Sequence, residues 1–329
     1  DLPLTLPQVE KYEPSETGES PLANITEWLN TEKGRRETNT MPQWAGSCWY
    51  FLRFIDPLND FEPWSKEKEK YWMPVDLYVG GVEHAVLHLL YSRFWHHVLF
   101  DLGFVSTKEP FQKLFNQGMI QGEDGQKMSK SRGNVINPDD VVKEYGADSF
   151  RLYEMFMGPL DKSKPWNTKG LQGCYRFLSK VWRLFHENTE NIKGDCSTKE
   201  TKILLHQTIK KITEDIEGLR FNTSVSQLMI FTNHLVSLEN LDYKTLHVFL
   251  QLLNPFAPHI TEEINQTILK NANSPLSSIQ WPSFDKSLIK SESYTLAVQV
   301  NGKMRGTIEI ETDLDENQII ELITNDSKL

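Results

Sequence analysis

Apolar residues recur every three to four positions in four consecutive stretches of the second half of the chain: residues 199–218, 222–238, 242–254 and 258–270. This spacing predicts amphipathic helices. Gly218, the region around Asn240 and the run Pro255-Phe256-Ala257-Pro258 interrupt the pattern. Residues 162–290 are therefore predicted to form an all-helical bundle.

The first half of the chain has a different pattern. Residues 74–81 are a β-prone run that ends in two glycines, residues 83–102 place apolar side chains at helical spacing, and residues 113–121 are a second strand-like run. A strand followed by a glycine turn and a helix is the unit of a doubly wound parallel α/β sheet, whose ligands bind at the carboxyl ends of the strands. Residues 41–161 are predicted to form part of such a Rossmann-like sheet, so the predicted fold class is α/β plus all-α.

Shorter segments surround these two parts. Asn137-Pro138 is predicted to cap a helix that Gly146 ends. Further helices are predicted over residues 47–54 and 148–157. Residues 1–40 are polar and contain several prolines, which predicts a β-rich connector. Residues 291–329 alternate in strand fashion to a turn at Asn301-Gly302, return, and end in a helix over residues 315–322, which predicts the truncated start of a small α/β domain.

Composition narrows the class of protein. The 329 residues give room for two or three domains, and no apolar run is long enough to span a membrane. A formal net charge of −10 argues against general nucleic-acid binding and against DNA, so any RNA contact depends on local basic faces. Three widely spaced cysteines without a CxxC pair favour a reducing compartment, and we expect the cytoplasm, or an organelle if a targeting peptide has been removed. The chain begins at Asp1 and not at methionine, and we therefore expect it to be a fragment.

The most distinctive stretch follows the strand-like run 113–121. Residues 127–134 combine three cations with small polar residues, and they include the string Lys127-Met128-Ser129-Lys130-Ser131. Lysine ammonium groups and serine hydroxyls supply the charge and the hydrogen-bond donors that polyphosphate oxygens require. A solvated basic loop is the ordinary interpretation of such a run. The neighbouring motifs decide between this interpretation and a polyphosphate-binding loop.

Two histidines lie where the sheet is expected to bind its ligand. Glu83, His84 and His88 fall on the first turns of the helix that follows the two glycines. Histidines four residues apart face the same way and can bind zinc. A metalloprotease helix carries His-Glu-x-x-His, however, and here the glutamate precedes the first histidine. We therefore predict no protein-bound zinc or other metal, and a structural role for His88 stays open.

A basic face opens the predicted bundle. Residues 162–183 hold six lysines or arginines and no acidic residue, and an apolar stripe that includes Phe177, Val181 and Phe185 lies behind them. Such a face is usually a solvated surface, but beside a nucleotide-binding domain it suits the phosphate backbone of an RNA.

Several motifs agree in order and spacing with one family. The chain resembles the C-terminal half of bacterial-type leucyl-tRNA synthetases, which are class I aminoacyl-tRNA synthetases. The motifs are Ser47-Cys48-Trp49-Tyr50, Gly80-Gly81-Val82-Glu83-His84, Lys127-Met128-Ser129-Lys130-Ser131, Tyr145-Gly146-Ala147-Asp148, Pro255-Phe256-Ala257-Pro258-His259 and Val300-Asn301-Gly302-Lys303-Met304-Arg305-Gly306. The first ATP motif of the family and the body of its editing domain are not in the sequence, and residues 1–40 resemble the return from that editing insertion.

The resemblance implies an ATP-dependent ligase that activates leucine as the adenylate and transfers it to the 3′ end of the tRNA for leucine. MgATP, leucine and this tRNA are the implied partners, and an N-terminal half would complete the enzyme, which we expect to be inactive as this fragment. Proofreading is not expected, because the editing body is missing. The implied catalytic residues on the β- and γ-phosphates are Lys127, Lys130, Ser129 and Ser131.

Further site residues follow from the same resemblance. The ATP or adenylate would contact Gly80, Gly81, Glu83, His84, His88, Met119 and Ile120. The leucine pocket would be formed by Trp44, Ser47, Tyr50 and His84. The tRNA would contact Lys169, Arg176, Lys180, Arg183, Lys303 and Arg305, the last two within the C-terminal α/β piece.

Three alternatives remain at this point. The chain could be a non-catalytic RNA-binding module, since the first ATP motif is missing. It could be one subunit of a natural split synthetase that needs a partner chain. It could also be the isoleucine or valine relative, since apolar pockets separate such side chains by only about 1–3 kcal/mol.

Overall fold

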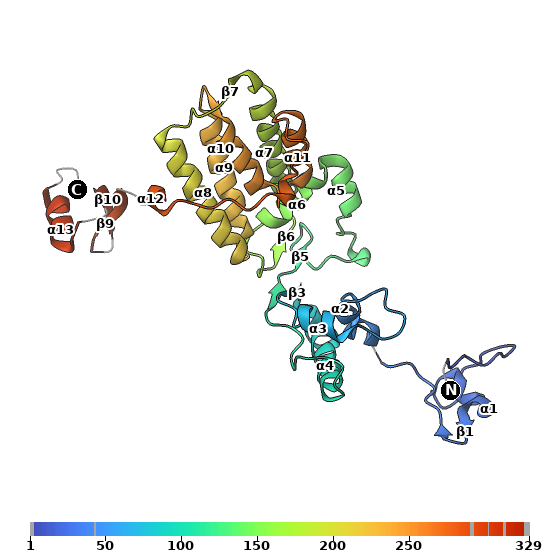
Figure 1. The fold of residues 1–329 in the computed structure, drawn as a ribbon. Coiled ribbons are helices and arrows are strands. Elements are labelled where there is room, and N and C mark those ends of the chain that lie inside the picture. The colour runs from blue at the N-terminus through green and yellow to red at the C-terminus, as the bar shows by residue number, and fades with distance from the viewer. Residues whose placement is uncertain (1–2, 43, 290–292, 302, 312–313, 326–329) are drawn as a thin grey trace. The chain divides into compact units, whose positions relative to one another are not determined.

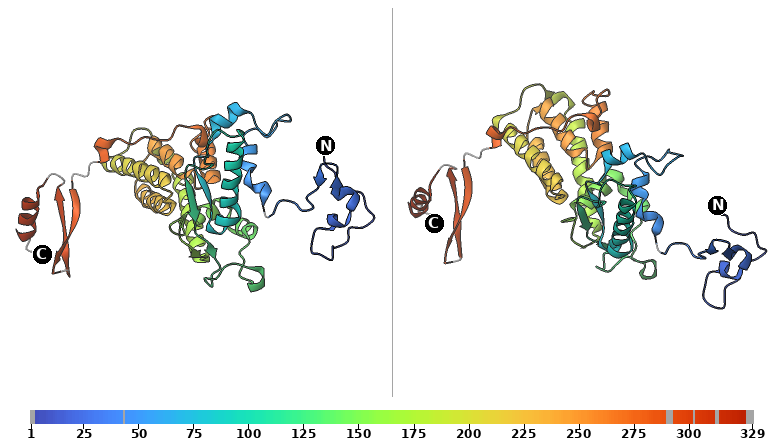
Figure 2. Two further views of the ribbon diagram at one scale, coloured as in Figure 1. Left: turned by 90° about the horizontal axis from the view of Figure 1, so that it is seen from below. Right: turned by 60° about the horizontal axis from the view of Figure 1, so that its bottom comes forward.

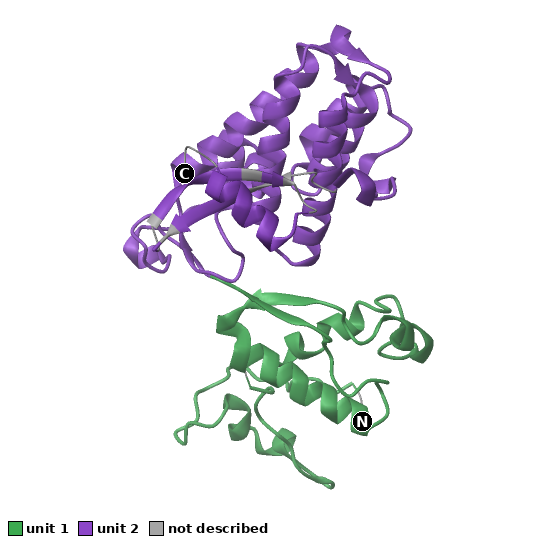
Figure 3. Ribbon diagram, turned by 90° about the vertical axis from the view of Figure 1, so that its left-hand side faces the viewer, with its two compact units in different colours: residues 1–118 green, residues 119–329 purple. Residues whose placement is uncertain are grey.

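A computed structural model describes residues 3–42, 44–289, 293–301, 303–311 and 314–325. The chain divides into two compact units, Asp1–Gly118 and Met119–Leu329 (Figure 3). This division falls inside the range 41–161 that the sequence assigned to one domain, and the predicted domain limits stay a prediction. Each unit is described by itself.

The described part of residues 1–40 is mostly irregular. It contains the one-turn helices η1 (Pro21–Asn24) and α1 (Thr26–Leu29) and a hairpin of two-residue strands, β1 (Asn30–Thr31) and β2 (Gly34–Arg35). The Trp28 ring packs under the Arg36 guanidinium at 5.2 Å, and its indole nitrogen donates to the Thr5 carbonyl oxygen at 3.1 Å. The prediction of a β-rich segment was wrong, because side-chain contacts and short turns hold this segment together in place of a strand ladder.

The first unit also contains a strand–helix–strand element. β3 (Tyr78–Gly81) pairs in parallel with β4 (Leu114–Gln117), with Tyr78 opposite Leu114 and Gly81 opposite Gln117. Between the strands lie the one-turn η3 (Val82–His84), the π-helix η4 (Ala85–Leu90) and α4 (Tyr91–Asp101). The predicted parallel α/β unit is therefore confirmed, with β3 ending at the two glycines.

Local irregularities separate this unit from its prediction. The helix predicted over residues 47–54 is broken into η2 (Ala45–Cys48) and α2 (Tyr50–Arg53), because Trp49 has a φ of −140°. α3 (Lys66–Trp72) was not predicted. A small core of Phe51, Leu52, Trp64, Met73 and Val105 lies among these elements. The apolar stripe of residues 83–102 is largely outside that core: Val86 is 66% exposed and Phe94 is 65% exposed.

The second unit begins with a short parallel pair. β5 (Ile120–Gln121) pairs with β6 (Lys164–Pro165), so the strand predicted over residues 113–121 is divided between two sheets. Between β5 and β6 lie α5 (Pro138–Tyr145) and α6 (Ala147–Phe156). The Asn137 side chain caps α5 by accepting from the Asp139 amide, and Gly146, with a φ of +84°, ends that helix, as predicted.

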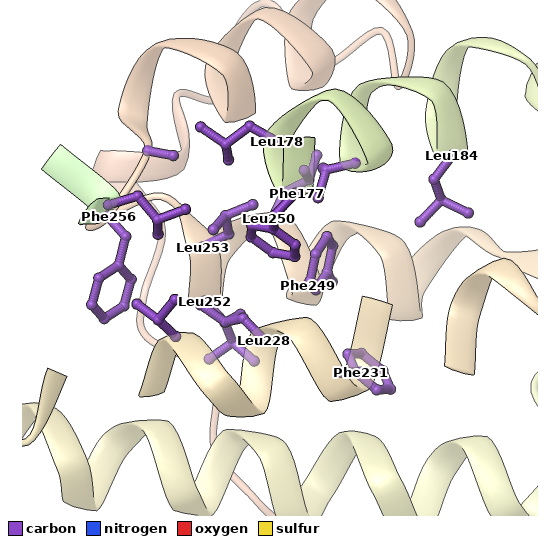
Figure 4. Close-up of a cluster of buried hydrophobic side chains, with 14 of the residues drawn as sticks. Phe177, Leu178, Leu184, Leu228, Phe231, Phe249, Leu250, Leu252, Leu253 and Phe256 are labelled. Atoms are coloured by element: carbon purple, nitrogen blue, oxygen red, sulfur yellow. The ribbon is translucent and has the colours of Figure 1, made fainter. Parts of the chain in front are cut away.

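Long helices form the predicted bundle (Figures 1 and 2). They are α7 (Thr168–His186), α8 (Lys199–Glu217), α9 (Phe221–Val236), α10 (Tyr243–Leu253) and α11 (Pro258–Thr267). α8 and α9 lie side by side. Phe177, Leu228, Phe231, Phe249 and Leu250 meet in the core between the helices (Figure 4). The bundle prediction is confirmed, because long amphipathic segments fold according to their periodicity.

Short elements join and follow the helices. η6 (Thr189–Asn191) leads into β7 (Ile192–Lys193), which pairs with β8 (Leu241–Asp242). η7 (Leu276–Ser278) and α12 (Lys286–Ile289) occupy the stretch predicted as loop. The predicted terminal hairpin is β9 (Ser293–Val300) antiparallel to β10 (Lys303–Glu311), followed by α13 (Glu316–Asn325). Gly302, part of the predicted turn, is outside the described residues. Among the described helices, none has the length and apolar character needed to cross a bilayer.

Candidate functional site

The basic loop starts from a tight turn after β5. Gln121 and Lys127 form an antiparallel bridge, and inside it the Gly122 amide donates to the Gln126 carbonyl oxygen at 2.9 Å. The Gly125 amide in turn donates to the Gly122 carbonyl oxygen at 2.9 Å, and Gly125 has a φ of +71°. Glycine adopts this left-handed conformation at low cost. The turn therefore presents Lys127 at a fixed place after the strand.

Asn134 closes the far end of the loop. Its side-chain oxygen accepts from the Ser129 amide at 2.9 Å, and its side-chain nitrogen donates to both oxygens of Asp124 at 3.1 Å. The hydrogen bond from the Gln126 amide and those from the Asn134 side-chain nitrogen lower the pKa of the Asp124 carboxyl. A Cβ on Gly122 would lie 2.7 Å from Asp124 Oδ1 and 2.8 Å from Asn134 Nδ2, so the cross-link needs a glycine there.

The cross-linked loop exposes its cations. Lys130–Arg132 form the one-turn helix η5, and Gly133, with a φ of +67°, ends it. Lys127 and Lys130 are exposed, and within the described part of the chain neither ammonium group contacts a carboxylate. The hydroxyls of Ser129 and Ser131 lie 3.1 Å apart. Two unpaired ammonium groups with hydroxyls beside them can bind a polyphosphate.

Met119 and Ile120, predicted to face the nucleotide, begin this unit. The Met119 amide donates to Ser163 Oγ at 3.1 Å, and the Met119 carbonyl oxygen accepts from the Lys164 amide at 3.0 Å. Ile120 is paired in β5 and packs partly against the bundle core. The backbone groups of Met119 are therefore occupied, which leaves its half-buried side chain for an apolar contact.

Glu123 joins the loop to the first helix of the bundle. Its carboxylate accepts from Thr168 Oγ1 at 2.7 Å at the start of α7. Thr168 Oγ1 also accepts from the indole nitrogen of the buried Trp166 at 3.1 Å. The basic loop and the N-terminus of α7 are thus held in one arrangement.

In the first unit, the Glu83 carboxylate lies against the backbone of Gly81 at the end of β3. A Cβ on Gly81 would lie 2.1 Å from Glu83 Oε2, so only glycine lets Glu83 fold back over the strand end. Glu83 is exposed and lies 3.9 Å from Nε2 of His84. The His84 ring is 5.8 Å from the ring of Trp44. These predicted residues therefore come together at the carboxyl end of β3.

Beside them, Ser47, Tyr50, Tyr78 and His88 form a hydrogen-bonded cluster. The Tyr50 and Tyr78 hydroxyls are 2.7 Å apart, and the Tyr78 hydroxyl is 2.5 Å from His88 Nε2. His88 Nδ1 lies 3.2 Å from Ser47 Oγ. Burial lowers the pKa of His88, helped by the nearby His84, and burial raises the pKa of Tyr78. The lowered pKa favours the neutral His88 ring, and both of its ring nitrogens have partners.

This arrangement places His88 with Ser47 and Tyr50, which are predicted to form the leucine pocket. Both ring nitrogens of His88, which a zinc ion would need as ligands, already have hydrogen-bond partners. Among the described residues, no group of three or more His, Cys, Asp or Glu side chains is arranged to hold a metal ion. The two histidines of α4 contact the Thr107–Glu109 turn: His96 bonds to Thr107 and His97 to Glu109.

The basic face lies on α7. Lys169, Arg176 and Arg183 are exposed along that helix, while Lys180 donates to the Asn233 side chain at 2.7 Å. Arg305 on β10 is exposed as well. The side chain of Lys303 is outside the described residues. The structure therefore places three of the predicted tRNA-contact residues on one helix as exposed side chains.

Sequence reasoning missed Tyr78, Glu123, Asp124 and Asn134 as members of the site. Tyr78 reads as an ordinary strand residue, and its partner His88 is known only from the fold. Asn134 was within the noted loop, and its spacing from Asp124 gave no sign of a bond, because that bond requires the turn between them.

Comparison with known families now defines the class. Residues 12–163 match the model of class I tRNA synthetases (I, L, M and V), and residues 202–320 match the anticodon-binding domain of tRNA ligases. The parallel strands, the cross-linked Lys-Met-Ser-Lys-Ser loop and the following bundle are thus parts of a class I tRNA synthetase.

Within this class, the relatives are of one kind. The chain is 58% identical over 328 residues to the leucine–tRNA ligase of Chlorobaculum parvum and 59% identical to that of Chlorobaculum tepidum, with 98% of the chain covered in each. This similarity confirms the resemblance to leucine–tRNA ligases. The chain spans 40% of the length of these curated relatives.

A solved structure of a leucyl-tRNA synthetase is also similar to this chain. In the ternary LeuRS–tRNA–LeuAMS complex of Agrobacterium radiobacter K84, the synthetase matches 94% of this chain with a TM-score of 0.79 and 35% identity, and 43% of that chain is covered. The predicted fold class is therefore confirmed.

Proposed function

We propose that this chain is the part of a leucine–tRNA ligase that holds the pyrophosphate leaving group, walls the leucine pocket and carries tRNA-binding helices. The proposed reaction joins leucine to ATP with release of pyrophosphate and then transfers leucine to the 3′ end of the tRNA for leucine. The observation that carries the proposal is the loop in which Asp124 and Asn134 fix the backbone while Lys127 and Lys130 remain unpaired with any carboxylate of the described chain. The identity of the relatives supports leucine as the amino acid.

The first step needs positioning and charge stabilisation more than covalent chemistry. The leucine carboxylate attacks the α-phosphate of MgATP, and negative charge grows on the pyrophosphate that leaves. Lys127 and Lys130 would neutralise this charge, and the Ser129 and Ser131 hydroxyls would donate to the same oxygens. Magnesium enters with ATP as part of the substrate.

The carboxyl end of β3 would hold the adenylate. Gly80 has no atom within 4 Å of an added Cβ, so a nucleoside can approach the backbone there. Glu83, held over Gly81, would accept from the ribose hydroxyls, and His84 would lie between the adenylate and the leucine side chain. The Met119 side chain and Ile120 would contact adenine.

The leucine pocket would be walled by Trp44, Ser47, Tyr50 and His84. Trp44 is 50% exposed and Tyr50 is 37% exposed, so both rings have a face available to a ligand. His88 joins this group through its bonds to Ser47 and Tyr78. The predicted contact of His88 with the nucleotide stays a prediction.

The tRNA would bind along α7 through Lys169, Arg176, Lys180 and Arg183, with Lys303 and Arg305 contributing from β10. With a net charge of −10 on the whole chain, these local cations must supply the attraction for phosphate. Lys180 is already bonded to Asn233, so it would contribute charge more than a new hydrogen bond.

The test is amino-acid-dependent exchange of pyrophosphate into ATP. The chain is assayed alone and together with a polypeptide that supplies the remaining part found in relatives, with leucine, isoleucine or valine. Exchange only in the mixture and only with leucine is expected. Exchange with isoleucine or valine in preference to leucine would overturn the substrate. If no mixture shows exchange and the tRNA is still bound, the chain would be a non-catalytic RNA-binding module.

A further inference from the structure

Ser47, Tyr50, Tyr78 and the neutral His88 ring have one hydrogen-bonding proton each, and geometry decides where each proton points. Ser47 Oγ lies 2.7 Å from the Trp44 carbonyl oxygen, which can only accept. The contact of Ser47 Oγ with His88 Nδ1 is longer, at 3.2 Å. Ser47 therefore donates its proton to Trp44 and accepts from His88, so the proton of the neutral imidazole is on Nδ1.

The rest of the chain of bonds follows from that proton. With Nδ1 protonated, Nε2 is an acceptor, and the Tyr78 hydroxyl at 2.5 Å donates to it. Because the Tyr78 proton is then used, the Tyr50 hydroxyl at 2.7 Å must donate to the Tyr78 oxygen. The order is Tyr50 to Tyr78 to His88 to Ser47 to the Trp44 carbonyl. All four protons are used inside the wall.

We propose that Tyr78 is a positioning residue of the leucine pocket, whose hydroxyl holds His88 in the Nδ1–H form and so directs the protons of Ser47, Tyr50 and His88 away from the ligand. This inference rests on the proposed assignment of Ser47 and Tyr50 to that pocket. An aliphatic side chain gains most from a wall that shows it no unsatisfied polar group. A polar side chain that needs a hydrogen-bond donor finds no free one in this cluster.

The packing of the Tyr78 ring fixes the place of its hydroxyl. Tyr78 is half-buried, and its ring stacks on Phe111 with centroids 4.0 Å apart and an interplanar angle of 14°. Phenylalanine at position 78 keeps that stacking and loses only the hydroxyl. Without the hydroxyl, Nε2 has no donor, and the imidazole gains by moving its proton to Nε2 while Ser47 turns to donate to Nδ1 and leaves Trp44. The pocket wall then presents a donor that leucine cannot satisfy.

Two measurements test the proposal. The first is nitrogen-15 NMR of the histidine rings in the 329-residue chain, with the His88 signals assigned from His88→Gln. Wild type is expected to show a protonated Nδ1 and a bare Nε2, and Tyr78→Phe is expected to populate the Nε2–H form. Tyr71→Phe is the matched control, because Tyr71 is an exposed tyrosine of the same unit, 79% exposed. A wild-type His88 with the proton on Nε2, or no change in Tyr78→Phe, would overturn the proposal.

The second measurement is pyrophosphate exchange by the completed enzyme. Tyr78→Phe is expected to raise the KM for leucine about threefold to tenfold, the size expected for one lost hydrogen bond, with the KM for ATP and kcat nearly unchanged. Equal effects on leucine and ATP, or a changed tautomer with an unchanged KM for leucine, would reject the positioning role. The NMR result does not depend on catalysis, so an enzyme that activates another amino acid, or none, leaves the tautomer test intact and fails only the proposed function.

Discussion

Asn134 donates to both carboxylate oxygens of Asp124 at 3.1 Å and joins two points of the basic loop that are ten residues apart in sequence. The side-chain oxygen of Asn134 accepts from the Ser129 amide at 2.9 Å, and Ser129 is the middle residue of the Lys-Met-Ser-Lys-Ser string. One amide side chain therefore fixes the backbone that carries Lys127 and Lys130. Both lysines extend from a loop that is already in shape before a phosphate arrives.

Removing this cross-link should weaken catalysis without unfolding the protein. In Asn134→Ala the Ser129 amide and the Asp124 carboxylate lose their partner, and the lysines are no longer held in place. We expect pyrophosphate exchange by the completed enzyme to fall about tenfold to a hundredfold, as misplacement of a positioned group by about 1 Å can do. Asn273→Ala, at an exposed asparagine of the same unit, is the control. Equal activity of the two variants would show that the cross-link does not position the loop.

Two glycines of α7 should respond in opposite ways to alanine. A Cβ on Gly170 would lie 2.9 Å from the ring of Tyr153, whose hydroxyl accepts from the Asn167 amide at 2.7 Å, whereas a Cβ on Gly173 meets no atom within 4 Å. Gly170→Ala is expected to lower the free energy of unfolding by about 1–3 kcal/mol through overpacking. Gly173→Ala is expected to raise it by about 0.5–1 kcal/mol, because alanine favours the helix. Urea unfolding measures both, and the same sign for both would contradict the packing described here.

The ionised Asp56 carboxylate should stabilise the first unit, and this stability should fall as the pH is lowered. Lys68 and Asn59 hydrogen-bond to its carboxylate and, with the Ser65 amide, lower its pKa from 3.8 to about 2. Because the folded pKa is below the ordinary value, this contribution is complete above pH 3.8 and is lost as the pH falls toward 2. Urea unfolding at about pH 5 and about pH 3 should show a smaller loss in Asp56→Asn than in wild type. A loss of equal size in both would argue against this carboxylate as the source.

Arg176 tests the tRNA surface. It is exposed on α7, and the variant Arg176→Gln removes one charge that would face a phosphate. The slope of log affinity against log salt for tRNA should decrease by about 1. Lys210→Gln is the control, because Lys210 is on α8 and lies 3.9 Å from Glu214. Identical slopes for wild type and Arg176→Gln would remove α7 from the binding surface.

The sequence predicted those features that short-range rules determine. Asn137 caps α5 and Gly146 ends it because a side-chain cap and a left-handed residue act within one turn. The bundle helices follow from periodicity over ten or more residues. The loop around Lys130 was found because its residue types are unusual together.

Features that depend on distant contacts were missed. The break at Trp49, the π-helix Ala85–Leu90 and the division between β4 and β5 have no local signal. Tyr78 and His88 are ten residues apart, and only the return of the helix over the strand end brings the hydroxyl to the imidazole. The grouping of Ser47 with His88 likewise spans 41 residues.

The most direct test of the account is leucine-dependent pyrophosphate exchange by the completed enzyme carrying Lys130→Ala. Lys143→Ala is the matched control, because it removes the same charge from an exposed lysine of α5. We expect Lys130→Ala to lose about a hundredfold to a thousandfold in kcat, as when one preorganised group that stabilises developing charge is removed, and Lys143→Ala to keep wild-type exchange. Wild-type exchange by Lys130→Ala would contradict the assignment of this loop to the leaving pyrophosphate.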